Sequence, residues 1–331
     1  MNRKEQAILR ILKETDKPLS GRKIMMELLQ TGYEISERTV RLYLHKMDEA
    51  GLTQNFGKRG RQISERGIEE LEATGIIEKV GFLSAKINQM TYRMSFDLES
   101  GTGTVVVNVS LVKPEDLLVC AVEIERAFAE GFAMGELLSL LYPGEHIGKA
   151  VIPLGYVGFA TVCSITLNGV LLQYGIPTNS RFGGLLELQS KEAVRFVEII
   201  NYDGTSLDPL EAFIRSGMTD YRGAIATGDG KIGASFREFP ADSRGLVENL
   251  AEKLDGISMG GFMTLGWPGQ SLLDIPVNED SFGAVVVGGL NPAAILEENG
   301  FRIKLRALAG LLDCQRFFHY SEMIKRLKQG S

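Results

Sequence analysis

A length of 331 residues exceeds what one hydrophobic core usually organises, so two or three domains are expected. Hydrophobic residues at 44% and charged residues at 24% are close to the globular average, which excludes a largely disordered or fibrous chain. The three cysteines lie far apart and outside any CxxC pattern, so neither a disulfide framework nor a zinc site is indicated, and a reducing cytoplasm fits best.

The charge is unevenly distributed along the chain. Residues 1–66 contain 14 lysines and arginines against 9 acidic residues, a net charge of +5, so the remaining chain carries −11 within a total of −6. A short basic module on an acidic body is expected when the module contacts phosphates and the body does not. Chance clustering on a solvated face is the alternative, and charge alone does not decide between them.

Three short helices are predicted in the basic module, each with an apolar face and a recognisable start or stop. The predicted helices are residues 5–14, ending near Asp16 to Pro18; 21–30, capped by Ser20 and ending at Gly32; and 37–50, capped by Ser36 and closed by Gly51. A tight turn joins the second and third helices, which is the layout of a helix-turn-helix.

The third predicted helix has the properties of a recognition helix. Val40, Leu44 and Met47 form its buried stripe, which leaves an outer side with arginines near its N-terminal half. Arginine can bond a guanine edge with two hydrogen bonds, so this side is predicted to enter a DNA major groove. The predicted contacts from this helix are Arg38, Thr39, Arg41 and His45.

A hairpin is predicted next, in LTQNFGKRGRQISERG, where two short runs flank a tip at Gly57 to Gly60. Cations on such a wing would meet phosphates or the minor groove. The predicted contacts are Lys58, Arg59 and Arg61. Ser64 is predicted to cap a further helix that leads out of the module. These elements predict a winged helix-turn-helix DNA-binding domain over residues 1–80; a three-helix protein-interaction module is the alternative.

One stretch, residues 150–180, has no charged side chain and invites interpretation as a membrane span. Prolines and glycines interrupt it, however, and Gln173 and Asn179 would lack partners in lipid. We therefore predict a buried strand, helix and strand, and no membrane association.

Residues 81–331 are predicted to form an internally duplicated α+β domain. FATVCSITLNGVLLQYG, from Phe159, resembles FGAVVVGGLNPAAILEENG, from Phe282, and other glycines, prolines and a Met-Gly pair recur at offsets of 123 to 127. The copies span about 101–200 and 221–315, each with a strand, a longer helix, a strand, a short helix and a strand. Such halves would pack about a pseudo-twofold axis and favour a ligand in the crevice between them. Chance similarity of short apolar words is the alternative.

The two Leu-Asn words predict helix starts at Asn168 and Asn291. Helix N-termini present unpaired N–H groups and a partial positive charge, so two facing ends could hold a dicarboxylate. Arg181 is the preferred ligand contact, because an arginine in an otherwise uncharged segment is either paired internally or reserved for an anion. The residues predicted to bind the effector are Asn168, Gly169, Arg181, Asn291, Lys304 and Arg306. The alternative is that both asparagines only cap their helices.

Other chemistry is not indicated. The words GTGTV, ATGDGKIG and SMGGF lack the spacing of dinucleotide and P-loop motifs, and His146 and His319 have no acidic neighbours at metal-ligand spacing. No catalytic grouping is visible in the linear sequence, so no enzyme, catalytic residue, metal or cofactor is predicted.

A winged helix followed by YVGFATVCSITLNGVLLQYGIPTNSRFGGLLEL resembles the archaeal nitrogen-assimilation repressors called NrpR, over nearly the whole chain. The resemblance implies a cytoplasmic repressor of nitrogen-fixation and glutamine-synthetase genes that binds an inverted-repeat operator on double-stranded DNA and is released by 2-oxoglutarate. Family members have one or two copies of the large domain. This chain has one, so a homodimer, or a complex with a partner protein built from the same domain, is expected.

Two other classes of function remain as alternatives. A metabolic enzyme built on the duplicated domain would require a catalytic grouping that the sequence does not display. A redox-switched regulator would use Cys120 or Cys163, yet both lie in apolar runs typical of buried, inert thiols.

Overall fold

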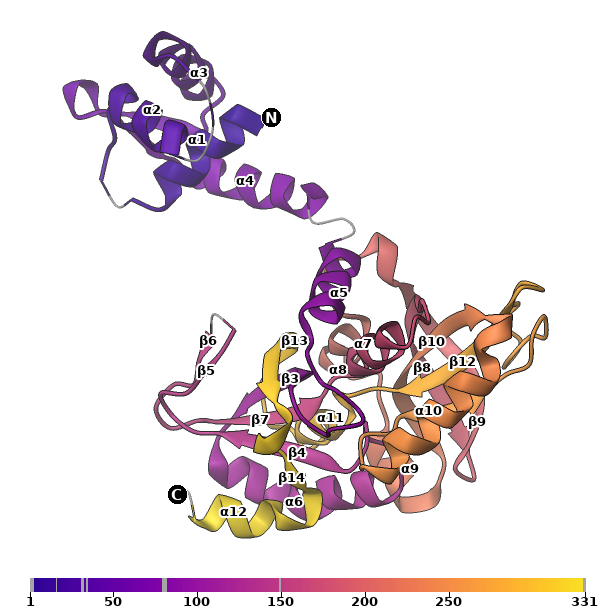
Figure 1. Cartoon of the computed structure of the whole chain (residues 1–331). Helices are drawn as coiled ribbons and strands as arrows, with labels where there is room; N and C mark the ends of the chain where they lie inside the picture. Colours follow the sequence, from indigo (N-terminus) through magenta and orange to yellow (C-terminus); the bar gives the residue numbers. More distant parts are fainter. Residues whose placement is uncertain are drawn as a thin grey trace. The chain divides into compact units, whose positions relative to one another are not determined.

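The computed structural model describes residues 3–15, 17–30, 33, 35–78, 82–148 and 150–329. The chain divides into two compact units, residues 1–80 and 81–331 (Figure 1). Each unit has a hydrophobic cluster of its own, so each buries its apolar side chains separately.

The described part of the N-terminal unit contains four helices and a two-stranded hairpin. Its elements are α1 (Arg3–Lys13), α2 (Gly21–Gln30), α3 (Glu37–Glu49), β1 (Thr53–Asn55), the 3-10 turn η1 (Gly57–Arg59), β2 (Arg61–Ile63) and α4 (Glu65–Glu78). Ile8, Leu28 and Leu44 come from three different helices and are fully buried in one cluster. The predicted winged helix-turn-helix is confirmed.

Serine caps mark the start of α3 and of α4. The Thr39 amide donates to Ser36 Oγ at 3.2 Å, and the Gly67 amide donates to Ser64 Oγ at 2.9 Å, which confirms these two predicted caps. At the third predicted cap, the Lys23 amide donates to Ser20 Oγ at 3.4 Å. The predicted stop signals at Asp16 and Gly32 lie outside the described residues.

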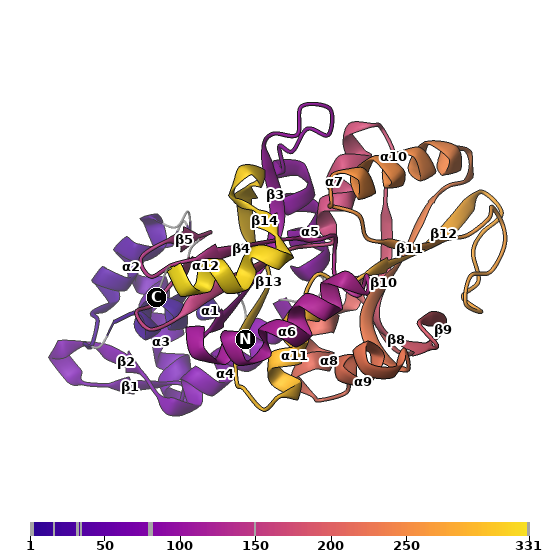
Figure 2. The same ribbon diagram turned by 90° about the horizontal axis from the view of Figure 1, so that it is seen from below.

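The second unit is built on two five-stranded antiparallel sheets, which lie side by side in both views (Figures 1 and 2). The strand orders are β13-β3-β7-β4-β14 and β11-β12-β10-β8-β9. The strands are β3 (Thr104–Val112), β4 (Leu137–Leu141), β5 (His146–Ile147), β6 (Ala150–Val151), β7 (Val157–Val162), β8 (Asn179–Gln189), β9 (Glu192–Asn201), β10 (Gly230–Pro240), β11 (Phe262–Leu265), β12 (Ser281–Val287), β13 (Lys304–Asp313) and β14 (Phe318–His319). The helices are α5 (Phe82–Arg93), α6 (Pro114–Ala129), α7 (Ile165–Gln173), α8 (Pro209–Arg215), α9 (Tyr221–Thr227), α10 (Arg244–Gly256), α11 (Asn291–Glu298) and α12 (Met323–Gln329).

The topology confirms the internal duplication. The first copy runs β3, α6, β4, β7, α7, β8, and the second runs β10, α10, β11, β12, α11, β13. Both contain the predicted elements plus one further strand after the longer helix. In one sheet, strands β3, β7 and β4 come from the first copy, and β3 pairs with β13 of the second copy. In the other sheet, strands β10, β12 and β11 come from the second copy, and β10 pairs with β8 of the first copy. Each copy therefore completes its sheet with the last strand of the other copy.

Hydrogen bonds show which positions of the two copies are equivalent. The Cys163 amide donates to Val106 O at 2.8 Å, and the Gly288 amide donates to Gly233 O at 2.9 Å. The following helical turn shows the same correspondence. The Thr166 hydroxyl donates to Val106 O, and the side-chain amide of Asn291 donates to Gly233 O. Thr166, and not Asn168, is thus equivalent to Asn291. The predicted pairing of the two Leu-Asn words, at an offset of 123, was therefore wrong by two residues, because a shift of two keeps every residue of the preceding strand on the same face.

Of the two predicted helix starts, the one at Asn291 is confirmed to within one residue, and the one at Asn168 is wrong. α7 begins at Ile165, so Asn168 and Gly169 lie inside the helix, and Asn291 is the first residue of α11 rather than its cap. A turn hydrogen bond from Thr166 N to Cys163 O, at 2.9 Å, forms at the start of α7, directly after β7. The helix therefore needs no side-chain cap.

The uncharged stretch is confirmed as buried strand, helix and strand, since it contains β7, α7 and the start of β8. Within the described ranges, no helix combines the length and the hydrophobicity needed to cross a bilayer.

Candidate functional site

The outer face of α3 is exposed and basic. Arg38 is exposed, and the Arg41 side chain is 71% exposed while it pairs with Glu37 one turn earlier. Leu42, 57% exposed, lies beside them on the same face, and sequence reasoning did not include it. A groove ligand would meet two guanidinium groups and one apolar side chain on this face.

The other two predicted residues of α3 differ in their environment. His45 is exposed and its Nδ1 lies 3.3 Å from Glu49 Oε1. Thr39 is only partly exposed, and its hydroxyl shares a 2.8 Å hydrogen bond with the hydroxyl of Ser36. Thr39 therefore helps to stabilise the start of the helix. His45 contacts Glu49 but remains exposed to solvent.

The hairpin presents two cations at its tip. Lys58 and Arg59 lie exposed in η1, between β1 and β2. The chain turns back at Gly60, where φ is +109° and an added Cβ would lie 2.2 Å from Leu19 O. Only glycine fits this close approach, so the position of both tip cations depends on it.

Arg61 has a different environment from the tip cations. Its Nε lies 2.8 Å from Asp48 Oδ2, the two side chains are 20% and 22% exposed, and Asp48 also accepts a hydrogen bond from Thr53. The pair ties β2 to the end of α3. Arg61 was predicted as a DNA contact, and the structure places it as a link between wing and helix.

In the second unit, the starts of the two short helices meet around a cavity of about 20 Å³, here called the central cavity. Residues 163–165 line it from the first copy and residues 288–290 from the second, and so do the equivalent strand positions Asn108 and Ser235. Eight of its thirteen lining residues are equivalent pairs, which places the cavity near the pseudo-twofold axis that relates the copies. Its volume suffices for a single water molecule.

Arg237 is fully buried on β10, on the same face of the strand as Ser235. Its Nη1 donates to Ser164 O at 2.9 Å and to Asn168 Oδ1 at 2.5 Å. Among the described residues, none accepts a hydrogen bond from its Nε or Nη2. Burial lowers its pKa to about 10, so the group stays charged at neutral pH. Removing one partner of a buried ion pair typically costs about 3–5 kcal/mol, because the other charge is left buried without a counterion. Arg237 is in this unfavourable state.

Titratable side chains surround the central cavity. Asp208 lines it and caps α8 through the amides of Leu210 and Glu211; burial nevertheless raises its pKa to about 6. Burial also raises the pKa of the Tyr202 hydroxyl, which lines the cavity too. On α5, Lys86 donates to Ala307 O at 3.2 Å, and burial lowers its pKa. The cavity thus has both acidic and basic neighbours.

The predicted effector residues do not form one site, and none of the six lines the central cavity itself. Asn168 contacts Arg237. Asn291 is buried and its amide donates to Phe132 O and Gly233 O, both at 2.9 Å, which is a structural role. Gly169 packs on Met94, whose Cε would lie 2.3 Å from an added Cβ.

The three predicted cations also differ from expectation. Arg181 pairs with Glu238 at 2.9 Å and donates to Pro276 O at 2.8 Å, so it is the internally paired case. Lys304 and Arg306 are exposed on β13, and Arg306 contributes to the lowered pKa of Lys86.

Sequence reasoning missed Arg237, Asn108 and Asp208. A signal was available for Asn108, because it is flanked by valines in β3, and a buried polar side chain in a strand requires partners. Arg237 lies next to Glu238 in a strand with several polar residues, so it carried a weaker signal. Asp208 lies in a polar loop and carried no such signal.

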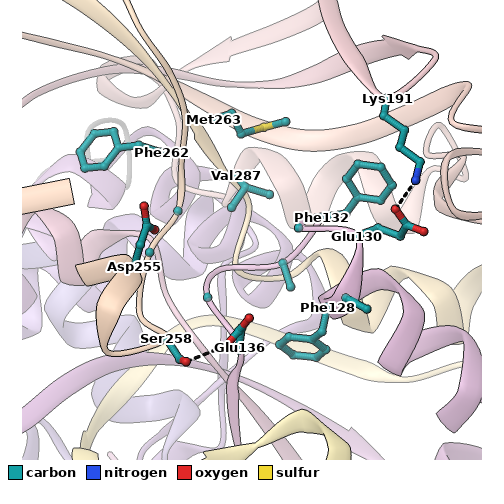
Figure 3. A pocket seen from close by; sticks show the side chains of 16 residues that line it. Phe128, Glu130, Phe132, Glu136, Lys191, Asp255, Ser258, Phe262, Met263 and Val287 are labelled. Carbon is teal, nitrogen blue, oxygen red and sulfur yellow. Dashed lines mark hydrogen bonds and ion pairs between the residues drawn. The ribbon is translucent and has the colours of Figure 1, made fainter. Parts of the chain in front are cut away.

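A larger pocket of about 460 Å³ lies where the loops after α6 and α10 meet (Figure 3). Its charged lining is Glu130, Glu136, Asp255 and Lys191. Figure 3 shows Lys191 paired with Glu130 and Ser258 hydrogen bonded to Glu136. Burial and the nearby Glu136 raise the pKa of Asp255. Three carboxylates against one lysine that is already paired disfavour a dianion, so this pocket does not suit a dicarboxylate.

The cysteines show no features of reactive thiols. Cys120, Cys163 and Cys314 are buried, and burial raises the pKa of Cys120 to about 11 and that of Cys163 to about 12. A reactive thiol needs a lowered pKa and access to solvent, so a redox switch at these residues is disfavoured.

Comparison with family models divides the chain in the same two parts. Residues 80–319 match the model described as NrpR regulatory domains NRD1 and 2, and residues 6–71 match the ribonuclease R winged-helix domain.

The chain is 34% identical over 315 residues to the global nitrogen regulator NrpRI of Methanosarcina mazei, covering 95% of this chain and 97% of that protein. It is 32% and 30% identical to the global nitrogen regulators NrpR of Methanococcus maripaludis and Methanocaldococcus jannaschii, and it spans 53% and 54% of their lengths. The crystal structure of a nitrogen repressor-like protein from Methanococcus jannaschii superposes with a TM-score of 0.61 at 27% identity, over 71% of this chain and 97% of that one.

Proposed function

The chain belongs to the NrpR family of nitrogen regulators, and we propose that it is a repressor that binds the operators of nitrogen-assimilation genes and releases them when 2-oxoglutarate binds. As a winged-helix regulator of nitrogen genes it is a DNA-binding protein. The regulatory unit supplies the response, and the N-terminal unit supplies the contact with DNA.

The observation that carries this proposal is the arrangement of cations in the N-terminal unit. Arg38 and Arg41 are exposed on the outer face of α3, and Lys58 and Arg59 are exposed at the tip of the hairpin. In a winged helix, the former would read base edges in the major groove while the latter would contact phosphates or the minor groove. Val40, Leu44 and Met47 form the buried stripe of α3, so Leu42 is the apolar side chain that shares the exposed face with the arginines.

A single winged helix reads one half-site, so we further propose that the chain acts as a homodimer on an inverted repeat. A complex with a partner protein built from the same regulatory domain would satisfy the same geometry. A DNA-binding regulator of metabolic genes acts in the cytoplasm, which is where we place it.

The effector is proposed from the resemblance and from the chemistry of the regulatory unit. The relatives are named regulators, and a regulator needs a ligand-dependent change in operator affinity rather than turnover. The coupling between effector and DNA is reciprocal and typically about 1–3 kcal/mol, a change of about 5- to 150-fold in affinity.

Selection of bound duplexes from a random pool, followed by fluorescence anisotropy on the enriched sequence, tests both parts. We expect an inverted repeat to be enriched. Titration with 2-oxoglutarate at constant salt is then expected to weaken its binding. Operator affinity that does not respond to 2-oxoglutarate would refute the effector, and failure to bind any duplex at low salt would refute the DNA-binding role.

A further inference from the structure

Arg237 uses only one of its three guanidinium nitrogens within the described chain. Nη1 bonds to Ser164 O and to Asn168, whereas Nε and Nη2 have no acceptor. These two nitrogens form one edge of the planar group, with two parallel N–H bonds. That edge is the one a carboxylate binds with two hydrogen bonds.

The surroundings of Arg237 favour an anion. Nη1 donates to the Ser164 carbonyl at the N-terminus of α7, where the helix dipole adds positive potential. Arg237 does not line the central cavity itself, but it bonds to Ser164 and interacts electrostatically with Cys163 and Tyr202, all three of which do. The start of α11 lines the same cavity from the other repeat. Lys86 interacts electrostatically with Cys163 and with Asp208, the one carboxyl group in the described lining of the cavity. Burial raises the pKa of Asp208 to about 6, which weakens its opposition to an anion. No carboxylate among the described residues forms an ion pair with Arg237.

The central cavity is too small for a metabolite in this conformation. Its volume of about 20 Å³ is far below the roughly 300 Å³ or more of small-molecule sites. The closure is made by backbone, since an added Cβ at Gly289 would lie 2.3 Å from Val162 O of the other repeat. Because the opposing walls follow β7 and β12, which belong to different sheets, a small separation of the two sheets would enlarge the cavity.

One wall of the cavity belongs to α5, which contributes Ile87. This helix is the first element of the regulatory unit along the chain and follows α4 of the N-terminal unit after residues 79–81. A ligand that enlarges the cavity would therefore displace the helix through which the regulatory unit is joined to the DNA-binding unit.

We propose that the Nε/Nη2 edge of Arg237 binds a carboxylate of a small dicarboxylate at the pseudo-twofold axis, and that ligand entry separates the starts of α7 and α11 and moves α5. This inference rests on the proposed function, because it gives the effector its site. In this proposal Arg237 recognises the anion. Arg181, the residue predicted from the sequence, is already paired with Glu238.

Two variants of the full-length chain test the proposal. Arg237→Met removes the donor edge and keeps the length of the side chain. Asn168→Asp is the sharper change, because it places a carboxylate where Arg237 already donates and so neutralises the guanidinium internally. Arg181→Met is the matched control, since it removes an arginine from the neighbouring strand β8, which pairs with β10.

Calorimetric titration with 2-oxoglutarate, glutarate and citrate measures ligand binding, anisotropy with an operator duplex measures DNA binding, and thermal unfolding checks the fold. We expect Arg237→Met and Asn168→Asp to weaken 2-oxoglutarate binding by at least about tenfold while both retain DNA binding. Asn168→Asp is also expected to unfold at a higher temperature, because it supplies the missing counterion, and Arg181→Met is expected to bind the ligand normally.

The outcomes separate the site from the proposed effector. Unchanged 2-oxoglutarate affinity in both variants would overturn the site and leave the effector role intact. Binding of a different dicarboxylate that depends on Arg237 would support the site and refute 2-oxoglutarate as the effector. Binding of none of the three ligands by the unmodified chain would overturn both. If Arg237→Met does not fold, Asn168→Asp decides.

Discussion

At the scale of single residues, exposed cations of the N-terminal unit divide into those placed to read bases and those placed to contact phosphates. Arg41→Ala is expected to cost about 1–3 kcal/mol on the preferred operator and to relax preference at one base pair, because arginine reads a base edge with two bonds. Lys58→Ala is expected to weaken all sequences evenly and to reduce the salt dependence by about one counterion. Anisotropy on matched and mutated duplexes at several salt concentrations measures both. Identical effects of the two substitutions would contradict the assignment.

Asp208 predicts a pH dependence of stability. Its pKa in the folded chain, about 6, lies above the ordinary value of 3.8, because burial disfavours the charged form. The folded state therefore binds a proton more tightly than the unfolded state. The stabilisation by protonated Asp208 is complete below about pH 4 and is lost as the pH rises through 6. The free energy of unfolding is expected to fall by up to about 3 kcal/mol over this range. Asp208→Asn keeps a side-chain acceptor for the cap of α8 and should remove this dependence. Urea unfolding of both proteins between pH 4 and 8 measures it, and parallel stability curves would rule it out.

At the scale of elements, the wing depends on one glycine. Gly60→Ala would bring a Cβ to 2.2 Å from Leu19 O at a φ of +109°, and we expect a loss of at least about 2 kcal/mol in the stability of the N-terminal unit. Operator affinity should fall with it, while ligand binding to the regulatory unit stays unchanged.

Gly57→Ala is the matched control, because Gly57 also has a positive φ, +62°, but has open space around it. It is expected to cost about 1 kcal/mol. Urea unfolding and anisotropy compare the two variants, and equal effects would mean that the close contact with Leu19 is unimportant.

At the scale of the whole molecule, the exchange of last strands makes the two repeats of the regulatory unit interdependent. β8 of the first copy pairs with β10 of the second, and β13 of the second pairs with β3 of the first. Fragments 82–206 and 207–331 would each leave sheets with unpaired edges and exposed apolar faces. We expect each fragment alone to be insoluble and the two together to form a folded complex.

Co-expression of the fragments with an affinity tag on one of them, followed by gel filtration and circular dichroism, measures this. A soluble, cooperatively unfolding single fragment would show that the repeats are independent domains.

The amino-acid sequence by itself determined the winged helix, its caps and its exposed cations, and the order of elements in the duplicated α+β unit. These features follow from local patterns: helical periodicity, a serine before a helix, and apolar runs that recur along the chain. Only the tertiary structure decided that the repeats exchange strands, that Arg181 is paired, and that Arg237 is buried without a counterion. Each of these depends on contacts between residues about 40 to 210 positions apart, and periodicity within one segment carries no information about such partners.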